Sequence, residues 1–167
     1  MSALVIDAFE YARLKEHRNG KLLLADLSRL RKETVESGSG AAIEWDLRGD
    51  ADALGHARLT LRIGGIVKLT CQRCLSPLDF DVTNEAVLIL AKDEDHADQI
   101  DALLANDELD VIVGSRAMSV IELVEDEALL AIPLSVRHDI CPDALVANDG
   151  SSKRPSPFAA LKELKRE

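Results

Sequence analysis

The period of the hydrophobic pattern changes along the chain. Near the N-terminus, Phe9 and Ala12 recur at helical spacing until an Asn-Gly pair interrupts the pattern. A second helical pattern follows, with Leu27 and Leu30 on its apolar side. We therefore predict that the segment 1–37 is helical.

A glycine- and serine-rich stretch separates this segment from one with a different period. Apolar and charged residues alternate over 43–48, and apolar side chains continue on alternate positions through 57–71. Gly64-Gly65 interrupts the alternation, and we expect a bulge or a sharp bend there. The pattern over 41–91 is typical of an antiparallel β-meander with one buried face.

The chain then becomes acidic before a second helical segment begins. Eight acidic residues lie within 92–110, which predicts a solvated surface loop. Ser119 and Glu122 have the spacing of a capping box, which predicts a helix over 119–132 that Pro133 ends.

These segments predict an α+β protein, a single small domain in which the meander packs with a few helices. The body is expected to span residues 1–142. Residues 143–167 are expected to form a flexible C-terminal tail, made of a polar linker and a short helix that begins after Pro157.

Charge and composition narrow the class of partner. The formal net charge is -10 and the isoelectric point is about 4.9, so the chain as a whole is unsuited to neutralising RNA phosphates. Aromatic residues make up only 3% of the chain, too few for a base-stacking surface. A basic protein is therefore a better partner than RNA, although a local, basic RNA contact stays open.

The chain has no apolar stretch long enough to cross a bilayer. Its N-terminus has no basic start and meets Asp7 too early for a secretory signal. The expectation is a cytoplasmic protein with no membrane contact. In that reducing compartment the three cysteines indicate metal binding or simple burial rather than disulfides.

Two motifs with the same two-residue gap supply possible metal ligands. Cys71 and Cys74 lie in the turn between two predicted strands, and His138 and Cys141 form a second pair, with 63 residues between Cys74 and His138. Together they make a Cys₃His set, complete for tetrahedral zinc. The alternative is a set of buried, reduced cysteines beside an unrelated histidine. A redox role is less favoured because strands, not a helix N-terminus, flank the first pair.

One charged residue falls on the apolar face of the helix predicted over 119–132. Glu127 shares that face with Val124 and Ala128, whereas Glu125 projects from the opposite, wet side. A buried carboxylate needs a partner, and Arg73 is the candidate. The alternative is that Glu127 reaches water.

The C-terminal segment is the basic part of this acidic chain. Phe158, Leu161, Lys162 and Lys165 are the candidate partner-binding residues, because they combine apolar anchors with lysines on a short helix. A helix this short is marginal alone in water, so it needs a surface to dock on. That surface is either a partner or the body of the same protein, and a frayed tail is the third possibility.

The ordered set of motifs resembles the YceD family of bacterial large ribosomal RNA subunit accumulation proteins. The resemblance depends on the Cys71–Cys74 motif, the segment 123–134, His138 with Cys141, and the segment 154–161. It covers the chain well from about residue 56 onward. Ser156 and Ile132 depart from the residues usual in the family.

The resemblance implies a cytoplasmic, non-enzymatic factor that promotes synthesis, processing or stability of large-subunit (23S) ribosomal RNA. The partner would be a large-subunit precursor or a ribosomal protein. Two alternatives stay open, a zinc-dependent RNA-processing enzyme and a zinc-stabilised protein-binding module with no ribosomal link. Four protein ligands would argue against the enzyme, because a catalytic zinc keeps an open position.

Overall fold

The computed structural model describes residues 4–35, 40–104 and 109–142. The strands are β1 (Val5–Ile6), β2 (His17–Leu23), β3 (Ala42–Ala51), β4 (Ala57–Gly64), β5 (Ile66–Thr70), β6 (Pro77–Asp81), β7 (Asn84–Ala91), β8 (Asp110–Val113) and β9 (Met118–Ser119). The helices are α1 (Ala8–Arg13), α2 (Leu30–Glu33), α3 (Glu94–Leu104) and α4 (Val120–Leu130), with a 3₁₀ turn at Leu24–Asp26. This is the predicted α+β class.

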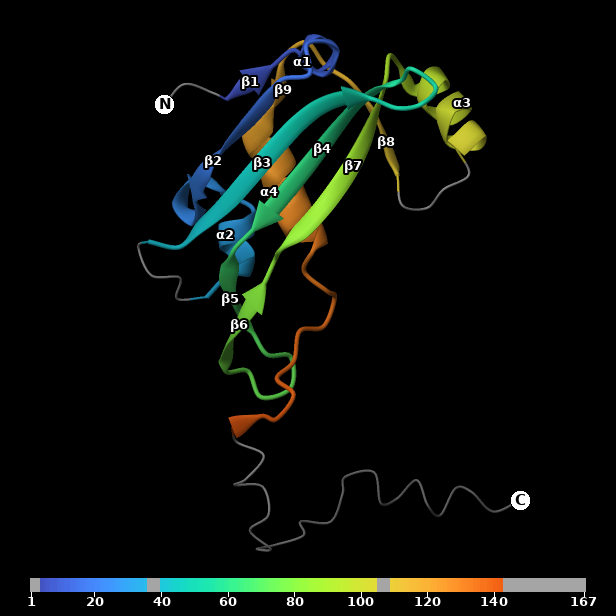
Figure 1. The fold of residues 1–167 in the computed structure, drawn as a ribbon. Coiled ribbons are helices and arrows are strands. Elements are labelled where there is room, and N and C mark those ends of the chain that lie inside the picture. The colour runs from blue at the N-terminus through green and yellow to red at the C-terminus, as the bar shows by residue number, and fades with distance from the viewer. Residues whose placement is uncertain (1–3, 36–39, 105–108, 143–167) are drawn as a thin grey trace, which may run out of the picture.

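The central sheet has the strand order β2-β3-β4-β7-β8 (Figure 1). Its first three pairs are antiparallel, and β8 joins β7 in parallel. Trp45 lies opposite Ile63 and Leu47 opposite Leu61, all four buried. The antiparallel meander with one buried face is therefore confirmed for β3, β4 and β7.

The glycine pair marks the point where the chain leaves this sheet. β4 ends at Gly64, and within the described residues β5 and β6 form a separate two-stranded antiparallel ribbon that extends beyond the sheet (Figure 1). A Cβ on Gly65 would lie 2.8 Å from Cδ1 of Ile43, so a side chain there would collide with the core. The meander is thus divided into a sheet and a separate ribbon.

The N-terminal segment differs from the prediction of a helical 1–37. Only α1, α2 and the 3₁₀ turn are helical in its described part, and His17–Leu23 is instead the edge strand β2, paired with β3. The inward positions of β2 include Gly20, under the Trp45 ring, and Arg18, stacked 5.5 Å from the Tyr11 ring centroid. Because these positions are not apolar, the alternation that marks a strand is missing.

The acidic segment 92–110 is also not the loop that its charge predicts. Residues 94–104 form α3, and residues 105–108 lie outside the described part. Ile100 is 1% exposed and packs with Ile89 and Ala91. One apolar stripe is enough to place a helix on the sheet, and the acids occupy its wet side.

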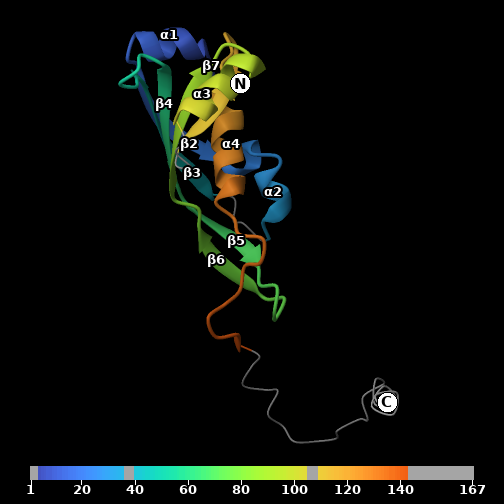
Figure 2. The same cartoon turned by 90° about the vertical axis from the view of Figure 1, so that its right-hand side faces the viewer.

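Helix α4 provides the core on the other face of the sheet. Ser119 caps it, since its Oγ accepts a hydrogen bond from the Glu122 N–H at 3.3 Å. Val124 and Ala128 are fully buried in the main core. Figure 2 shows α4 lying against the sheet, with α2 on the same side. No helix in the described ranges is long and apolar enough to span a membrane.

Candidate metal centre

The first two candidate ligands lie at the tip of the ribbon. Cys71 and Cys74 lie in the turn between β5 and β6, where the Cys71 N–H donates to the Ser76 carbonyl at 3.0 Å. The Leu75 N–H donates back to the Cys71 carbonyl at 2.9 Å, and Leu75 has a φ of 61°. A leucine in this left-handed region is strained, so the surroundings must hold the turn in place.

The second pair arrives on the segment that follows α4. Pro133 lies just beyond the helix, and residues 134–142 then run along the ribbon. The Gln72 N–H donates to the Val136 carbonyl at 2.9 Å, and the Val136 side chain is buried. This attachment aligns His138 and Cys141 with the hairpin turn.

The structure brings all four candidate ligands together. Their Sγ and imidazole nitrogen atoms all lie within 4.8 Å of one another. The Sγ atoms of Cys71 and Cys141 are 3.8 Å apart, and the Cys74 Sγ is 3.4 Å from Nδ1 of His138. A tetrahedral zinc site places two sulfurs about 3.8 Å apart and a sulfur and a nitrogen about 3.6 Å apart. The donor set and its spacing therefore fit zinc.

The four groups of the cluster lie close enough to shift one another's pKa values. Burial raises the pKa of the Cys71 thiol, but the N–H groups of Cys74, His138 and Arg73 outweigh it and hold this pKa at about 5. The pKa of His138 is raised by its hydrogen bonds to the cysteine sulfurs. The lowered pKa favours a thiolate at Cys71, the form of cysteine that binds metal, whereas His138 would release its proton on binding an ion.

Arg73 belongs to this cluster and does not pair with Glu127, contrary to the sequence prediction. Its Nε donates to the Cys141 Sγ at 2.9 Å, and its terminal nitrogen donates to the carbonyls of His138 at 3.0 Å and Asp139 at 3.4 Å. Zinc with three thiolates and a neutral imidazole has a net charge of about -1. The Arg73 guanidinium would balance that charge from outside the ligand set.

Glu127 is buried but has a different partner from the one predicted. It is 8% exposed, and Nδ2 of Asn84 donates to its carboxylate at 2.5 Å. Desolvation raises its pKa. Asn84 lies at the start of β7, and no periodicity in the sequence indicates this contact.

Glu125, predicted on the wet face of the helix, is buried as well. The backbone N–H groups of Arg29 and Leu30 donate to Oε1 at 2.6 and 3.1 Å, and Nε of Arg29 donates to Oε2 at 2.9 Å. Burial raises the pKa of Glu125, but these donors outweigh it, and the net shift is downward. The prediction failed because α2 packs against the side of α4 that is polar in sequence.

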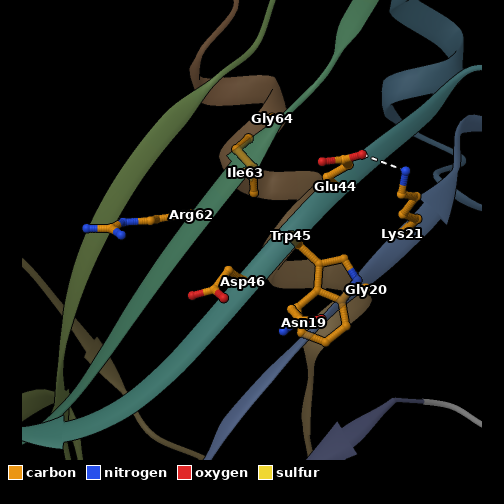
Figure 3. Close-up of a pocket in the computed structure, with 9 residues that line it drawn as sticks. All are labelled: Asn19, Gly20, Lys21, Glu44, Trp45, Asp46, Arg62, Ile63 and Gly64. Atoms are coloured by element: carbon orange, nitrogen blue, oxygen red, sulfur yellow. Dashed lines mark ion pairs between the residues drawn. The ribbon is translucent and has the colours of Figure 1, made fainter.

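The charged residues that line a hollow over β2, β3 and β4 all have partners (Figure 3). Lys21 pairs with Glu44 at 2.6 Å, and Arg62 pairs with Glu85 at 2.6 Å. Such exposed cross-strand pairs are typical of a solvated sheet face. The Cys₃His cluster is therefore the stronger candidate site.

The remaining candidate residues, Phe158, Leu161, Lys162 and Lys165, lie outside the described part of the chain.

Comparison with known proteins gives one match. The sequence matches the family described as "Large ribosomal RNA subunit accumulation protein YceD" over residues 59–165, a stretch that contains all four candidate ligands, α4 and most of the C-terminal segment. No curated protein and no solved structure matches the chain.

Proposed function

The chain belongs to the YceD family of large ribosomal RNA subunit accumulation proteins, and we propose that it promotes synthesis, processing or stability of 23S ribosomal RNA without catalysing a reaction. Four ligand atoms lie within 4.8 Å of one another, and this closed set supports a role without catalysis. In this proposal the protein works in the cytoplasm as an accessory factor of large-subunit assembly.

The ligand set supports a structural zinc rather than a catalytic one. Cys71, Cys74, His138 and Cys141 would fill all four tetrahedral positions, whereas a catalytic zinc keeps one position for water or substrate. Cys71 and Cys141 are also buried, with 0% and 3% exposure. Bound there, zinc would supply a cross-link between the hairpin turn and the segment after α4.

The ribbon tip is the proposed contact surface for a protein partner. Leu75, Leu134 and Ile140 lie on the two loops that the metal centre joins, and they are 74%, 108% and 80% exposed. Exposed apolar side chains in one region are a mark of protein interaction. The net charge of -10 favours a basic partner such as a ribosomal protein.

Sedimentation of cell extract tests the ribosomal role. The intact protein should co-sediment with large-subunit precursors on a sucrose gradient, and Cys71→Ser should weaken this association and lower the amount of 23S RNA. His17→Asn, which changes an exposed histidine on β2, is the matched control and should have no effect. A wild-type protein that stays at the top of the gradient, with unchanged 23S RNA after gene deletion, would contradict the proposal.

X-ray absorption at the zinc edge separates this role from the enzymatic alternative. We expect three sulfur ligands and one nitrogen ligand. An oxygen ligand in place of one of them would indicate an open position and favour a zinc-dependent RNA-processing enzyme.

A further inference from the structure

An apolar groove runs between α4 and the β8 edge of the sheet, away from the metal centre. Its volume is about 530 Å³, and its walls include Ile112 of β8 and Leu123, Leu129 and Leu130 of α4. Leu130 is 77% exposed although it borders an apolar surface. Apolar walls of this kind accept an amphipathic segment with apolar anchors.

Carboxylates lie among these apolar walls. Asp110, Asp126 and Glu127 all line the groove, and Asp126 pairs with Arg29 at 2.5 Å. In the described part of the chain, neither Asp110 nor Glu127 forms an ion pair with a basic side chain. Glu127 is 92% buried and has an amide, not a cation, beside it. A groove with these groups is complementary to an apolar segment that carries positive charge.

Residues 154–167 of the same chain have that chemistry. They contain four basic and two acidic residues, a sign opposite to the net charge of -10 of the whole chain. Phe158, Leu161, Lys162 and Lys165 have the spacing i, i+3, i+4, i+7, which places them on one face of a helix. On α4 the residues Leu123, Asp126, Glu127 and Leu130 have the same spacing. The stripe on the C-terminal segment therefore carries two lysines, and the stripe of equal length on α4 carries two carboxylates.

The length of the chain allows this segment to return to the groove. The chain leaves the groove at Leu130 and reaches Pro142 after twelve residues. Twelve more residues lead from Pro142 to Arg154, and the same number of residues has the same maximum reach. No stretching beyond the ordinary backbone repeat is needed.

We propose that residues 154–167 dock in the groove of their own chain, with Phe158 and Leu161 against the apolar walls and Lys162 and Lys165 beside the carboxylates of the groove. The segment then covers apolar surface of the body instead of serving as the contact with a partner. This proposal does not depend on the ribosomal role and can be tested on the purified protein.

The test uses the intact chain with Phe158→Ala and Leu161→Ala, which frees the groove, and a labelled synthetic peptide of residues 154–167 as the probe. The peptide should bind this double variant and shift the NMR amide signals of α4 and β8. It should bind the wild-type chain at least about tenfold more weakly, because the chain's own segment competes. Adding Leu130→Glu should remove peptide binding, whereas Leu103→Glu, at a similarly exposed leucine of α3, should not.

Several outcomes would overturn the proposal. Absence of peptide binding, or amide shifts confined to elements other than α4 and β8, would show that the groove is not the site. A wild-type chain that forms a dimer dissociated by the peptide would assign the groove to a second copy. If deleting 154–167 leaves the groove signals unchanged but abolishes co-sedimentation with ribosomal precursors, the segment binds a partner, and the ribosomal role stands without the docking.

Discussion

The central sheet and the β5–β6 ribbon are both built from alternating strands, yet they are stabilised differently. In the sheet, Leu47, Leu59 and Leu61 are at most 1% exposed, and α4 covers that face. In the ribbon, Val67 and Leu69 of β5 are buried, but the facing strand offers only the half-buried Leu78 and Phe80.

The ribbon therefore needs an anchor that the sheet does not. An isolated two-stranded hairpin is at best marginally stable in water. Backbone contacts attach the ribbon at two places, Val35 N–H to the Lys68 carbonyl at 2.8 Å and Gln72 N–H to the Val136 carbonyl at 2.9 Å. The Cys₃His cluster lies at the far end, where a bound metal would add to the hydrogen bonds that Gln72 and Arg73 make with the segment after α4.

Loss of the metal or of one ligand should destabilise the ribbon and leave the sheet nearly unaffected. The protein purified without chelators should carry about one zinc per chain. In Cys71→Ser, hydrogen-exchange protection of β5 and β6 should fall by at least about 100-fold, while the protection of β3 and β4 stays nearly unchanged. Elemental analysis and amide exchange measure the two effects. A wild-type protein that contains no metal, and whose ribbon amides are as well protected as those of Cys71→Ser, would contradict the proposed metal centre.

A substitution in the core of the sheet should weaken the sheet without affecting the metal centre at the ribbon tip. Leu47→Ala should lower the free energy of unfolding by about 2–5 kcal/mol, because the side chain is fully buried between the sheet and its cover. The zinc content of the folded protein should stay at that of the wild type. Urea denaturation and metal analysis check this, and loss of zinc from the folded variant would show that the two regions are not independent.

The two buried carboxylates of α4 should contribute differently to the stability of the body. Glu125→Gln should destabilise the protein by about 2–3 kcal/mol, since three donors from Arg29 and Leu30 lose a charged acceptor. Glu127→Gln should cost less than about 1 kcal/mol at neutral pH, because its neighbour Asn84 can still bond an amide. Denaturant unfolding at pH 7 measures both, and a larger loss at Glu127 would contradict the contacts seen here.

The same two residues should have opposite pH dependence. The folded pKa of Glu125 is lowered, so its stabilisation is present above the unfolded carboxyl pKa and is lost as the pH falls through the folded pKa. Glu125→Gln should therefore lose less stability on acidification than the wild type. The folded pKa of Glu127 is raised, so the stability it contributes falls as the pH rises, and the small cost of Glu127→Gln relative to the wild type should shrink further above about pH 4. Unfolding curves across the acid range would show both slopes.

Arg73 lies beside the metal centre but is not one of its ligands, so its replacement should have only a modest effect on zinc binding. Arg73→Gln removes the guanidinium that donates to the Cys141 Sγ but leaves all four ligands in place. Zinc affinity should fall by about 10–100-fold, as is usual when a residue that supports a ligand is lost. Competition with a chromophoric chelator measures this, and Arg137→Gln, an exposed arginine on the neighbouring loop, is the control. Equal zinc affinity in both variants would show that the Arg73 side chain does not support metal binding and only donates to the carbonyls of His138 and Asp139.

Features that depend on near neighbours along the chain could be predicted from the sequence alone. The alternation around Trp45 marks β3, Ser119 marks the start of α4, and the two-residue gaps of the cysteine and histidine pairs indicate a shared ligand set. Each signal is visible because side chains two, three or four positions apart share a face of a strand or helix, or can reach one ion.

The tertiary structure decided the contacts that join distant parts of the chain. The strand β2 exists because β3 supplies its hydrogen bonds, although its own residues, such as Gly20, lack an alternating pattern. Glu125 is buried by Arg29, which lies 96 residues away, and Arg73 turns to Cys141 rather than to Glu127. Periodicity assigns a residue to a face of its own element, but the free energy of burying a charge depends on which other element packs there, and only the folded chain specifies that neighbour.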